Sequence, residues 1–258
     1  MYSTYAWAKK SKEGNFEKIS IKRNINKDHD VTFELRYCGI CHTDVNVAEN
    51  FFGNALYPCV PGHELAGVVT SVGRRVSRVR VGDKVGVGYF ADACKDCHQC
   101  DNGIEQFCDK GSQRIEEEMM WRRWRRRIRI CKLFLIRLFE GMTMTFNDKP
   151  GHGNLATDSG WTYGGYSGQF TAPEKFVVKI PDDYPLENAG PVLCAGVTMF
   201  SPLKNYGAGQ GGLNVGVVGI GGLGQFGVTL AKAMGKRVLM YYLETSILVR
   251  TIRAFKHS

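Results

Sequence analysis

The 258-residue sequence lacks any run that approaches the roughly 18 uninterrupted apolar residues of a membrane-spanning helix. It also lacks a basic start followed by a long apolar stretch, and its last three residues form no recognised targeting signal. Its hydrophobic content of 43% and charged content of 23% are close to those of globular proteins, which excludes disordered and collagen-like chains. We therefore expect one large or two medium globular domains, located in the cytoplasm.

The net charge of +9 is concentrated in two segments rather than spread over the chain. Residues 113–140 carry nine positive and four negative side chains, residues 236–258 carry five and one, and the remainder is neutral. Within 113–140, apolar residues recur at intervals of three and four between arginines, which predicts a basic amphipathic helix. The meaning of the basicity therefore depends on whether these two segments belong to the fold.

The order of the predicted elements divides the chain into two domains. The first part is rich in short strands between Gly, Asp and Asn turns, with strands predicted at 31–37, 66–72 and 84–88. From about residue 186 a helix-like stretch precedes one βαβ unit, with a strand at 214–218, a helix at 223–234 and a strand at 237–242. We predict a β-rich domain over 1–185 and a second, α/β domain over 186–258.

Nine cysteines without a secretory signal argue against a disulfide framework and favour thiolate ligands. Four of them, Cys94, Cys97, Cys100 and Cys108, follow a C-x2-C-x2-C-x7-C spacing. Four thiolates complete the tetrahedral shell of zinc and leave no open position, so this group predicts a structural zinc site. Reduced thiols, a local disulfide or an iron–sulfur cluster are the alternatives.

A second group of potential ligands is spread over the sequence and needs the fold to unite it. It consists of Cys41, His63, Glu64 and Cys194. Each residue alone is more often an ordinary cysteine, histidine or glutamate than a ligand. Together they offer the mixed sulfur, nitrogen and oxygen donors of a catalytic zinc that keeps an exchangeable position.

A glycine-rich loop joins the predicted strand at 214–218 to the helix that follows. Gly219, Gly221 and Gly224 form a G-x-G-x-x-G pattern, in which backbone N–H groups and the helix N-terminus can hold a pyrophosphate. The pattern alone is weak evidence in a chain with 31 glycines, but its place between strand and helix favours a dinucleotide site. The predicted cofactor-binding residues here are Gly219, Ile220, Gly221, Gly222, Leu223 and Gly224.

Three stretches, CGICHTD at 38–44, PGHE at 61–64 and LCAGVT at 193–198, resemble motifs of the zinc-dependent medium-chain alcohol dehydrogenases. The resemblance is greatest to the cinnamyl-alcohol and mannitol dehydrogenases, and it extends from about residue 5 to residue 242. It implies an α/β fold with a β-rich GroES-like N-terminal domain and an incomplete Rossmann-type C-terminal domain. It also implies an NAD(P)-dependent oxidoreductase that interconverts an alcohol and an aldehyde.

The same resemblance assigns roles to individual residues. It implies that Cys41, His63 and Cys194 hold the catalytic zinc, with Glu64 as an alternate or nearby ligand. Asp44 is implied to hold the His63 ring from outside the metal shell.

The proton relay and the nicotinamide contact are also implied by resemblance. Thr43 is expected to hydrogen-bond the substrate oxygen and to start the proton relay. Thr198 is expected to contact the nicotinamide side. The sequence departs from the family at Asn46, where a relay histidine is common; because an amide does not titrate near neutral pH, the proton would leave through ribose and water.

Cofactor preference and partners are less directly encoded. Glu244 follows Gly224 by twenty residues and would favour NAD, whereas the resembled group favours NADP, which we expect on resemblance. The expected partners are an alcohol or aldehyde substrate, the nicotinamide cofactor and a second copy in a homodimer. We expect no nucleic-acid or membrane partner.

Two departures leave a second interpretation open. The segment 113–140 and the tail 244–258 do not resemble the family, and the predicted βαβ unit is shorter than a six-stranded cofactor domain. We interpret both segments as sequence foreign to the fold and expect the 258-residue chain to show little activity. The alternative is a non-catalytic, zinc-stabilised protein whose basic helix binds an anionic membrane or nucleic acid.

Overall fold

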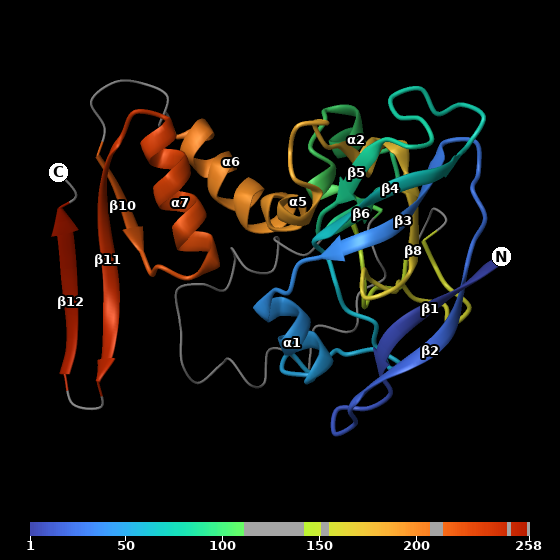
Figure 1. Cartoon of the computed structure of the whole chain (residues 1–258), viewed down its shortest axis with the longest axis horizontal. Coiled ribbons are helices and arrows are strands. Elements are labelled where there is room, and N and C mark those ends of the chain that lie inside the picture. The colour runs from blue at the N-terminus through green and yellow to red at the C-terminus, as the bar shows by residue number, and fades with distance from the viewer. Residues whose placement is uncertain (111–141, 151–154, 207–213, 247–248, 257–258) are drawn as a thin grey trace. The chain divides into compact units, whose positions relative to one another are not determined.

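The computed structural model describes residues 1–110, 142–150, 155–206, 214–246 and 249–256 (Figure 1). The chain divides into two compact units, Met1–Gly190 and Pro191–Ser258, called here the first and second unit. The basic helix predicted at 113–140 lies outside the described residues. Within the ranges given above, no helix is both long and apolar enough to cross a membrane.

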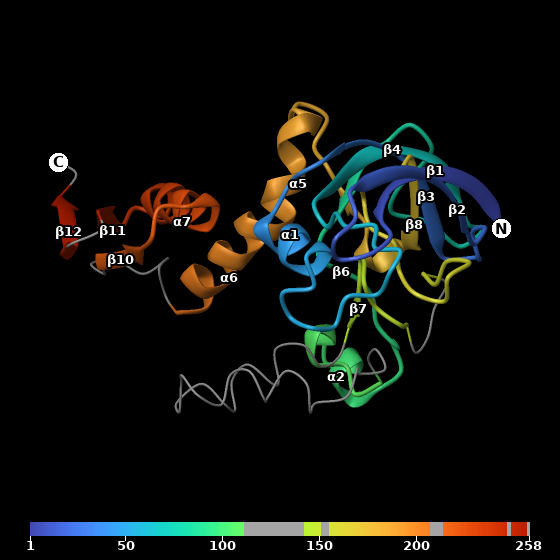
Figure 2. The same cartoon turned by 90° about the horizontal axis from the view of Figure 1, so that it is seen from below.

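A two-stranded antiparallel hairpin opens the first unit. It consists of β1 (Tyr2–Lys9) and β2 (Phe16–Arg23), which lie side by side along their whole length (Figures 1 and 2). Because successive side chains of a strand point to opposite faces, one face of the hairpin can be apolar. Ala6, Ala8 and Ile21 are buried on that face.

Five antiparallel strands form the main sheet of the first unit, in the spatial order β8–β3–β4–β5–β9. Cys38 at the end of β3 pairs with Leu65 at the start of β4, so the segments that follow β3 and precede β4 emerge at one place. The strands are β3 (Asp30–Cys38), β4 (Leu65–Val72), β5 (Lys84–Val87), β8 (Gln169–Pro173) and β9 (Val178–Lys179).

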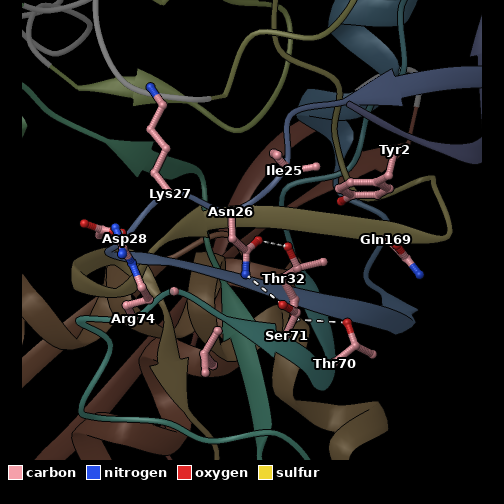
Figure 3. A pocket seen from close by; sticks show the side chains of 12 residues that line it. Tyr2, Ile25, Asn26, Lys27, Asp28, Thr32, Thr70, Ser71, Arg74 and Gln169 are labelled. Atoms are coloured by element: carbon pink, nitrogen blue, oxygen red, sulfur yellow. Dashed lines mark hydrogen bonds and ion pairs between the residues drawn. The ribbon is translucent and has the colours of Figure 1, made fainter.

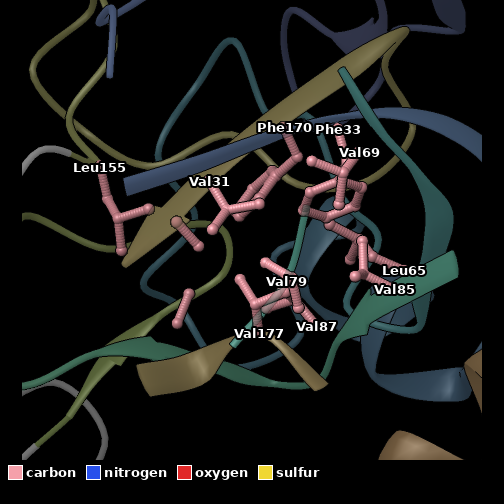
Figure 4. Close-up of a cluster of buried hydrophobic side chains, with 12 residues drawn as sticks. Val31, Phe33, Leu65, Val69, Val79, Val85, Val87, Leu155, Phe170 and Val177 are labelled. Carbon is pink, nitrogen blue, oxygen red and sulfur yellow. The ribbon is translucent and has the colours of Figure 1, made fainter. Parts of the chain in front are cut away.

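The apolar core of the first unit forms between these strands (Figure 4). The Phe33 and Phe170 rings are fully buried, with their centroids 5.9 Å apart. β-Branched residues pack well on a pleated surface, which explains the many valines. The core side chains are Val31, Phe33, Leu65, Val69, Val79, Val85, Val87, Ala91, Leu155, Phe170, Ala172 and Val177.

Short elements complete the first unit. A second small sheet pairs β6 with β7. The elements are α1 (His42–Ala48), β6 (Phe90–Asp92), α2 (His98–Asp101), η1 (Glu105–Phe107), β7 (Thr143–Met144), η2 (Glu174–Phe176) and η3 (Leu186–Asn188), followed by α5 (Ala189–Pro191), which reaches the boundary between the units.

The second unit is a three-stranded sheet, β10–β11–β12, with two helices that pack against each other. β10 and β11 are parallel and are connected by α7, which forms a βαβ unit, and β12 pairs antiparallel to β11. The elements are η4 (Val192–Gly196), α6 (Val197–Asn205), β10 (Asn214–Val218), α7 (Gly222–Ala233), β11 (Arg237–Ser246) and β12 (Val249–Lys256).

The β-rich first part and the later βαβ unit predicted from the sequence are both confirmed. β10 matches the predicted strand, and Gly235, with a φ of 74°, follows the end of α7 as the helix-terminating glycine. β11 runs four residues beyond the predicted strand, and β12 was not predicted. The last four residues of β11 and the whole of β12 lie beyond residue 242, where the sequence stops resembling the family, so the motifs gave no guide to them.

Replacing Phe33 by alanine tests the core of the main sheet. Because Phe33 is fully buried and packs on Phe170, we expect the free energy of unfolding to fall by about 3–5 kcal/mol. Urea denaturation followed by circular dichroism measures this change. Tyr37→Ala on the same strand is the control, since Tyr37 is 48% exposed; equal losses in both variants would contradict this description of the core.

Candidate metal centres and glycine-rich loop

The Asp44 carboxylate organises the region around α1. Oδ2 accepts a hydrogen bond from the backbone N–H of Cys41 at 2.9 Å, which fixes the start of the helix. Oδ1 accepts hydrogen bonds from the backbone N–H of Gly62 and from His63 Nδ1, both at 2.9 Å. These hydrogen bonds join the segment after β3 to the segment before β4. Because Asp44 is only 2% exposed, the connection lies inside the protein.

His63 is fixed by rings as well as by Asp44. It is 1% exposed, stacks on Phe146 at a centroid distance of 5.8 Å, and meets the edge of Tyr89 at 5.0 Å. With Nδ1 donating to Asp44, Nε2 is the ring nitrogen suited to bind a metal ion. The structure thus places the Asp44 carboxylate on the His63 ring, and the role of Asp44 in holding that ring for a metal ion stays a prediction.

Cys41, His63 and Glu64 are brought together, with their potential ligand atoms within 4.8 Å of one another. Cys41 precedes α1 and is half-buried, while Glu64 is 5% exposed. A thiolate, an imidazole and a carboxylate are the donor types of a catalytic zinc, so the residues fit this ion. Cys194 lies on η4 in the second unit, four residues after the end of the first.

The four cysteines of the predicted structural site also converge. The sulfur atoms of Cys94, Cys97, Cys100 and Cys108 lie within 4.8 Å of one another, and three of these residues are buried. Backbone N–H groups point at the sulfurs: Cys94 N donates to Cys108 Sγ and Asp109 N donates to Cys97 Sγ, both at 3.4 Å. The cluster therefore presents the four sulfur donors of a closed tetrahedral zinc site.

The thiols of this cluster differ in acidity. Burial raises the pKa of Cys94 to about 11 and also raises the pKa values of Cys100 and Cys108. At Cys97, burial is outweighed by the backbone N–H groups of Asp109 and Cys100, and the pKa falls to about 7. The Cys97 thiol is thus the most acidic of the four, and a bound cation would favour ionisation of the others.

The glycine-rich loop has the geometry that a phosphate site needs. Gly219 has a φ of 86°, and a Cβ on Gly224 would lie 1.9 Å from the Gly219 carbonyl oxygen, so both positions require glycine. Gly221 and Gly222 are exposed with open space around them, at the start of the twelve-residue α7. The first backbone N–H groups of α7 are therefore accessible to an anion.

The remaining predicted site residues lie on helices. Thr43 is half-buried in the first turn of α1, beside Asp44. Asn46, which stands where a relay histidine is common in the resembled family, is half-buried on the same helix. Thr198 is exposed on α6 in the second unit.

Three residues of the first metal region were missed by the sequence analysis. A Cβ on Gly39 would lie 1.8 Å from Glu64 Oε2, and Gly62 has a φ of 105° with backbone nitrogens 2.8 Å from its would-be Cβ. Both glycines stand inside the motifs CGICHTD and PGHE, and this position was the signal by which the sequence could have identified them. Tyr166 donates its hydroxyl to Asp44 Oδ2 at 3.2 Å, and no sequence spacing connects it with α1.

A groove of about 500 Å³ on the first unit lies apart from these residues (Figure 3). Its polar side chains pair with one another: Asn26 donates to Ser71 Oγ at 3.2 Å and accepts from Thr32. None of the predicted metal ligands or cofactor-binding residues lines it. We therefore assign it no part in the site.

The family model described as "Alcohol dehydrogenase GroES-like domain" matches residues 27–122. A probable mannitol dehydrogenase of Mesembryanthemum crystallinum is 38% identical over 234 residues, which cover 91% of this chain and 55% of the relative. Cinnamyl alcohol dehydrogenase 7 of Arabidopsis thaliana is 39% identical over 234 residues, with the same coverage. The chain thus spans about half the length of the curated relatives it matches.

Solved structures give a similar result. A cinnamyl alcohol dehydrogenase from Sorghum bicolor has a TM-score of 0.76 at 37% identity, covering 93% of this chain and 58% of the neighbour. The CAD from Helicobacter pylori, complexed with NADP(H), has a TM-score of 0.74 at 33% identity, covering 92% and 58%. These neighbours confirm the predicted fold class, including an incomplete Rossmann-type second part.

Removing one thiolate tests the four-cysteine centre. We expect the purified protein to hold zinc at this centre, and Cys100→Ser to lose one zinc ion per chain and to unfold at lower temperature, because three thiolates no longer close the shell. Elemental analysis and thermal denaturation measure both effects. Cys59→Ala, which changes a buried cysteine outside the cluster, is the control, and folded wild-type protein without zinc would refute the assignment.

The buried thiol of Cys59 predicts a pH dependence of stability. Burial raises its pKa from 9.0 to about 12, so between these values the unfolded chain loses a proton that the folded chain keeps. The stabilisation is fully present below pH 9 and is lost as pH rises through 12. Urea unfolding between pH 9 and 12 should therefore show a steeper loss for wild type than for Cys59→Ala, and equal slopes would contradict the shift.

Proposed function

We propose that the chain belongs to the zinc-dependent medium-chain alcohol dehydrogenase family, to whose cinnamyl alcohol and mannitol dehydrogenases it is similar, and that its protein interconverts an alcohol and an aldehyde with a nicotinamide cofactor. The observation that carries this proposal is the Cys41–His63–Glu64 cluster, with its ring nitrogen oriented by Asp44. A closed structural site would need four firm protein ligands, whereas this donor set suits a metal that keeps an exchangeable position.

We propose that Cys194 completes this centre as its third firm ligand beside Cys41 and His63. Its sequence position supports the proposal, since only a few residues separate it from the end of the first unit. Glu64 is then a nearby carboxylate that can replace an outgoing ligand. The bound zinc ion would supply a positive charge that polarises an aldehyde carbonyl or lowers the pKa of an alcohol.

The protein side chains supply orientation and proton transfer. Thr43, in the first turn of α1, is the hydroxyl that hydrogen-bonds the substrate oxygen and passes on its proton. Asn46 cannot take over that proton, because an amide has no titration near neutral pH. Water and the cofactor ribose therefore complete the proton path.

The proposed cofactor is NADP, with its pyrophosphate at the glycine-rich loop. The exposed N-terminal backbone of α7 supports this location, and the Helicobacter pylori neighbour is complexed with NADP(H). Thr198 is proposed to contact the nicotinamide side. A homodimer and a cytoplasmic location, both expected from the sequence, remain proposals that size-exclusion chromatography and cell fractionation would test.

Substitutions at the two sites should separate chemistry from cofactor binding. In the full-length protein that carries this sequence, Cys41→Ser or His63→Ala should lower the turnover of cinnamaldehyde with NADPH by roughly 1,000-fold or more, because each removes a ligand of the reacting centre. NADPH binding should be retained in both variants. The absorbance of the reduced nicotinamide reports turnover, and calorimetric titration reports binding.

A matched pair of controls makes this test specific. Cys59→Ala removes another cysteine of the first unit and should leave turnover near wild type. Gly224→Val should abolish NADPH binding while both zinc ions stay bound, since its Cβ would collide with the Gly219 carbonyl. Turnover near wild type in Cys41→Ser would show that the cluster is not the reacting centre.

A further inference from the structure

Tyr166 reaches the Asp44 carboxylate from a distant part of the chain. Its hydroxyl donates to Oδ2 at 3.2 Å, across 122 positions of sequence. The other donors to Asp44 are the backbone N–H groups of Cys41 and Gly62 and the Nδ1 of His63. Two of those donors are backbone groups. Tyr166 and His63 are the side chains, and they donate to different oxygens of the carboxylate, Oδ2 and Oδ1.

The Tyr166 hydroxyl can donate a hydrogen bond throughout the neutral pH range. Burial and the neighbouring Asp44 raise its pKa above the ordinary value of 10.0, so the O–H remains protonated throughout the neutral range. Its backbone is fixed on both sides, because Tyr166 N donates to the Pro61 carbonyl at 3.0 Å and Trp7 N donates to the Tyr166 carbonyl at 2.8 Å. The hydroxyl is therefore presented to Asp44 by a rigid segment.

Arg23, the last residue of β2, fixes the same segment. The guanidinium is 3% exposed and donates through Nη2 to the carbonyls of Tyr163 and Gly164 and to Ser167 Oγ, at 2.9 to 3.0 Å. Its centre also lies 4.8 Å from the centroid of the Phe170 ring. Burial lowers its pKa to about 10, which leaves it charged at neutral pH.

The acceptors of this buried cation are neutral. Two carbonyl oxygens and a hydroxyl stabilise the charge less than a carboxylate would, so they offset only part of the cost of burying Arg23. All three acceptors lie in the turn over residues 163–167, which contains Tyr166. The contacts thus run from Arg23 through the turn to Tyr166, then to Asp44 and His63.

We propose that Tyr166 is a positioning residue of the Cys41–His63 metal centre, aimed by the buried Arg23: its hydroxyl holds Asp44, and through Asp44 it holds the His63 ring in the orientation that binds the metal. This inference rests on the proposed metal centre. Partners of this kind typically change metal affinity by about 10- to 100-fold when they are removed.

Tyr166→Phe tests the proposal, with Tyr2→Phe as the matched control. The Tyr2→Phe variant also loses one hydrogen bond, which joins the Tyr2 hydroxyl to Thr171 Oγ1 at 3.0 Å. Both residues lie far in sequence from the metal residues. Competition with a zinc-binding dye measures affinity, and the four-cysteine centre serves as an internal reference. We expect Tyr166→Phe to weaken zinc binding at the Cys41–His63 centre about 10-fold, with the reference centre and the melting temperature matching those of Tyr2→Phe.

The outcomes separate this proposal from the one on which it rests. If wild type binds zinc at the Cys41–His63 centre and Tyr166→Phe binds it equally well there, Tyr166 has no positioning role although the metal centre stands. Equal weakening of both centres would indicate a general structural defect and would also overturn the proposal. If wild-type protein binds zinc only at the four cysteines, the metal centre itself is wrong.

A double variant tests the link to Arg23. Arg23→Lys keeps the charge but loses the planar fork, and it should weaken the same centre in the same direction. Because both residues act through one contact to Asp44, combining Arg23→Lys with Tyr166→Phe should cost no more than Tyr166→Phe alone. Additive losses would show that Arg23 does not act through Tyr166.

Discussion

The buried carboxylate of Asp44 is the interaction on which the metal region of the first unit depends. Through two oxygens it connects the N-terminus of α1, the Gly62 backbone, the His63 ring and the Tyr166 hydroxyl. A carboxylate without these donors would be costly to bury, and the donors without the carboxylate would have no common acceptor. Helix start, histidine orientation and a distant turn are thereby determined together.

The sheet provides the positions that this carboxylate joins. The pairing of Cys38 with Leu65 places the segments of Cys41 and His63 next to each other, although the two ligands are 22 positions apart in sequence. The four-cysteine cluster needs no such support, because its ligands lie within 15 consecutive residues and its loop is short. One centre is therefore a product of the fold, whereas the other is local.

This difference explains what could be predicted from the sequence. The spacing of Cys94, Cys97, Cys100 and Cys108 predicted a cluster that the structure confirms, and the glycine pattern predicted the loop before α7. Cys41 and His63 were candidate ligands by residue type alone, but their assignment to one catalytic centre was predicted through resemblance, because no periodicity connects them. Tyr166 and Arg23 could not be predicted, since their contacts depend on the path of a turn that joins distant strands. β12 was missed for a related reason: its pairing with β11 lies beyond the region where the motifs gave guidance.

Anomalous diffraction at the zinc absorption edge, on crystals of zinc-loaded protein, tests the account most directly. The account predicts two peaks: one among the four cysteines, and one within the usual zinc–ligand distances of about 2.0–2.3 Å from His63 Nε2 and Cys41 Sγ. A single peak at the four cysteines, with His63 still bonded to Asp44, would contradict the claim that this carboxylate orients a metal ligand.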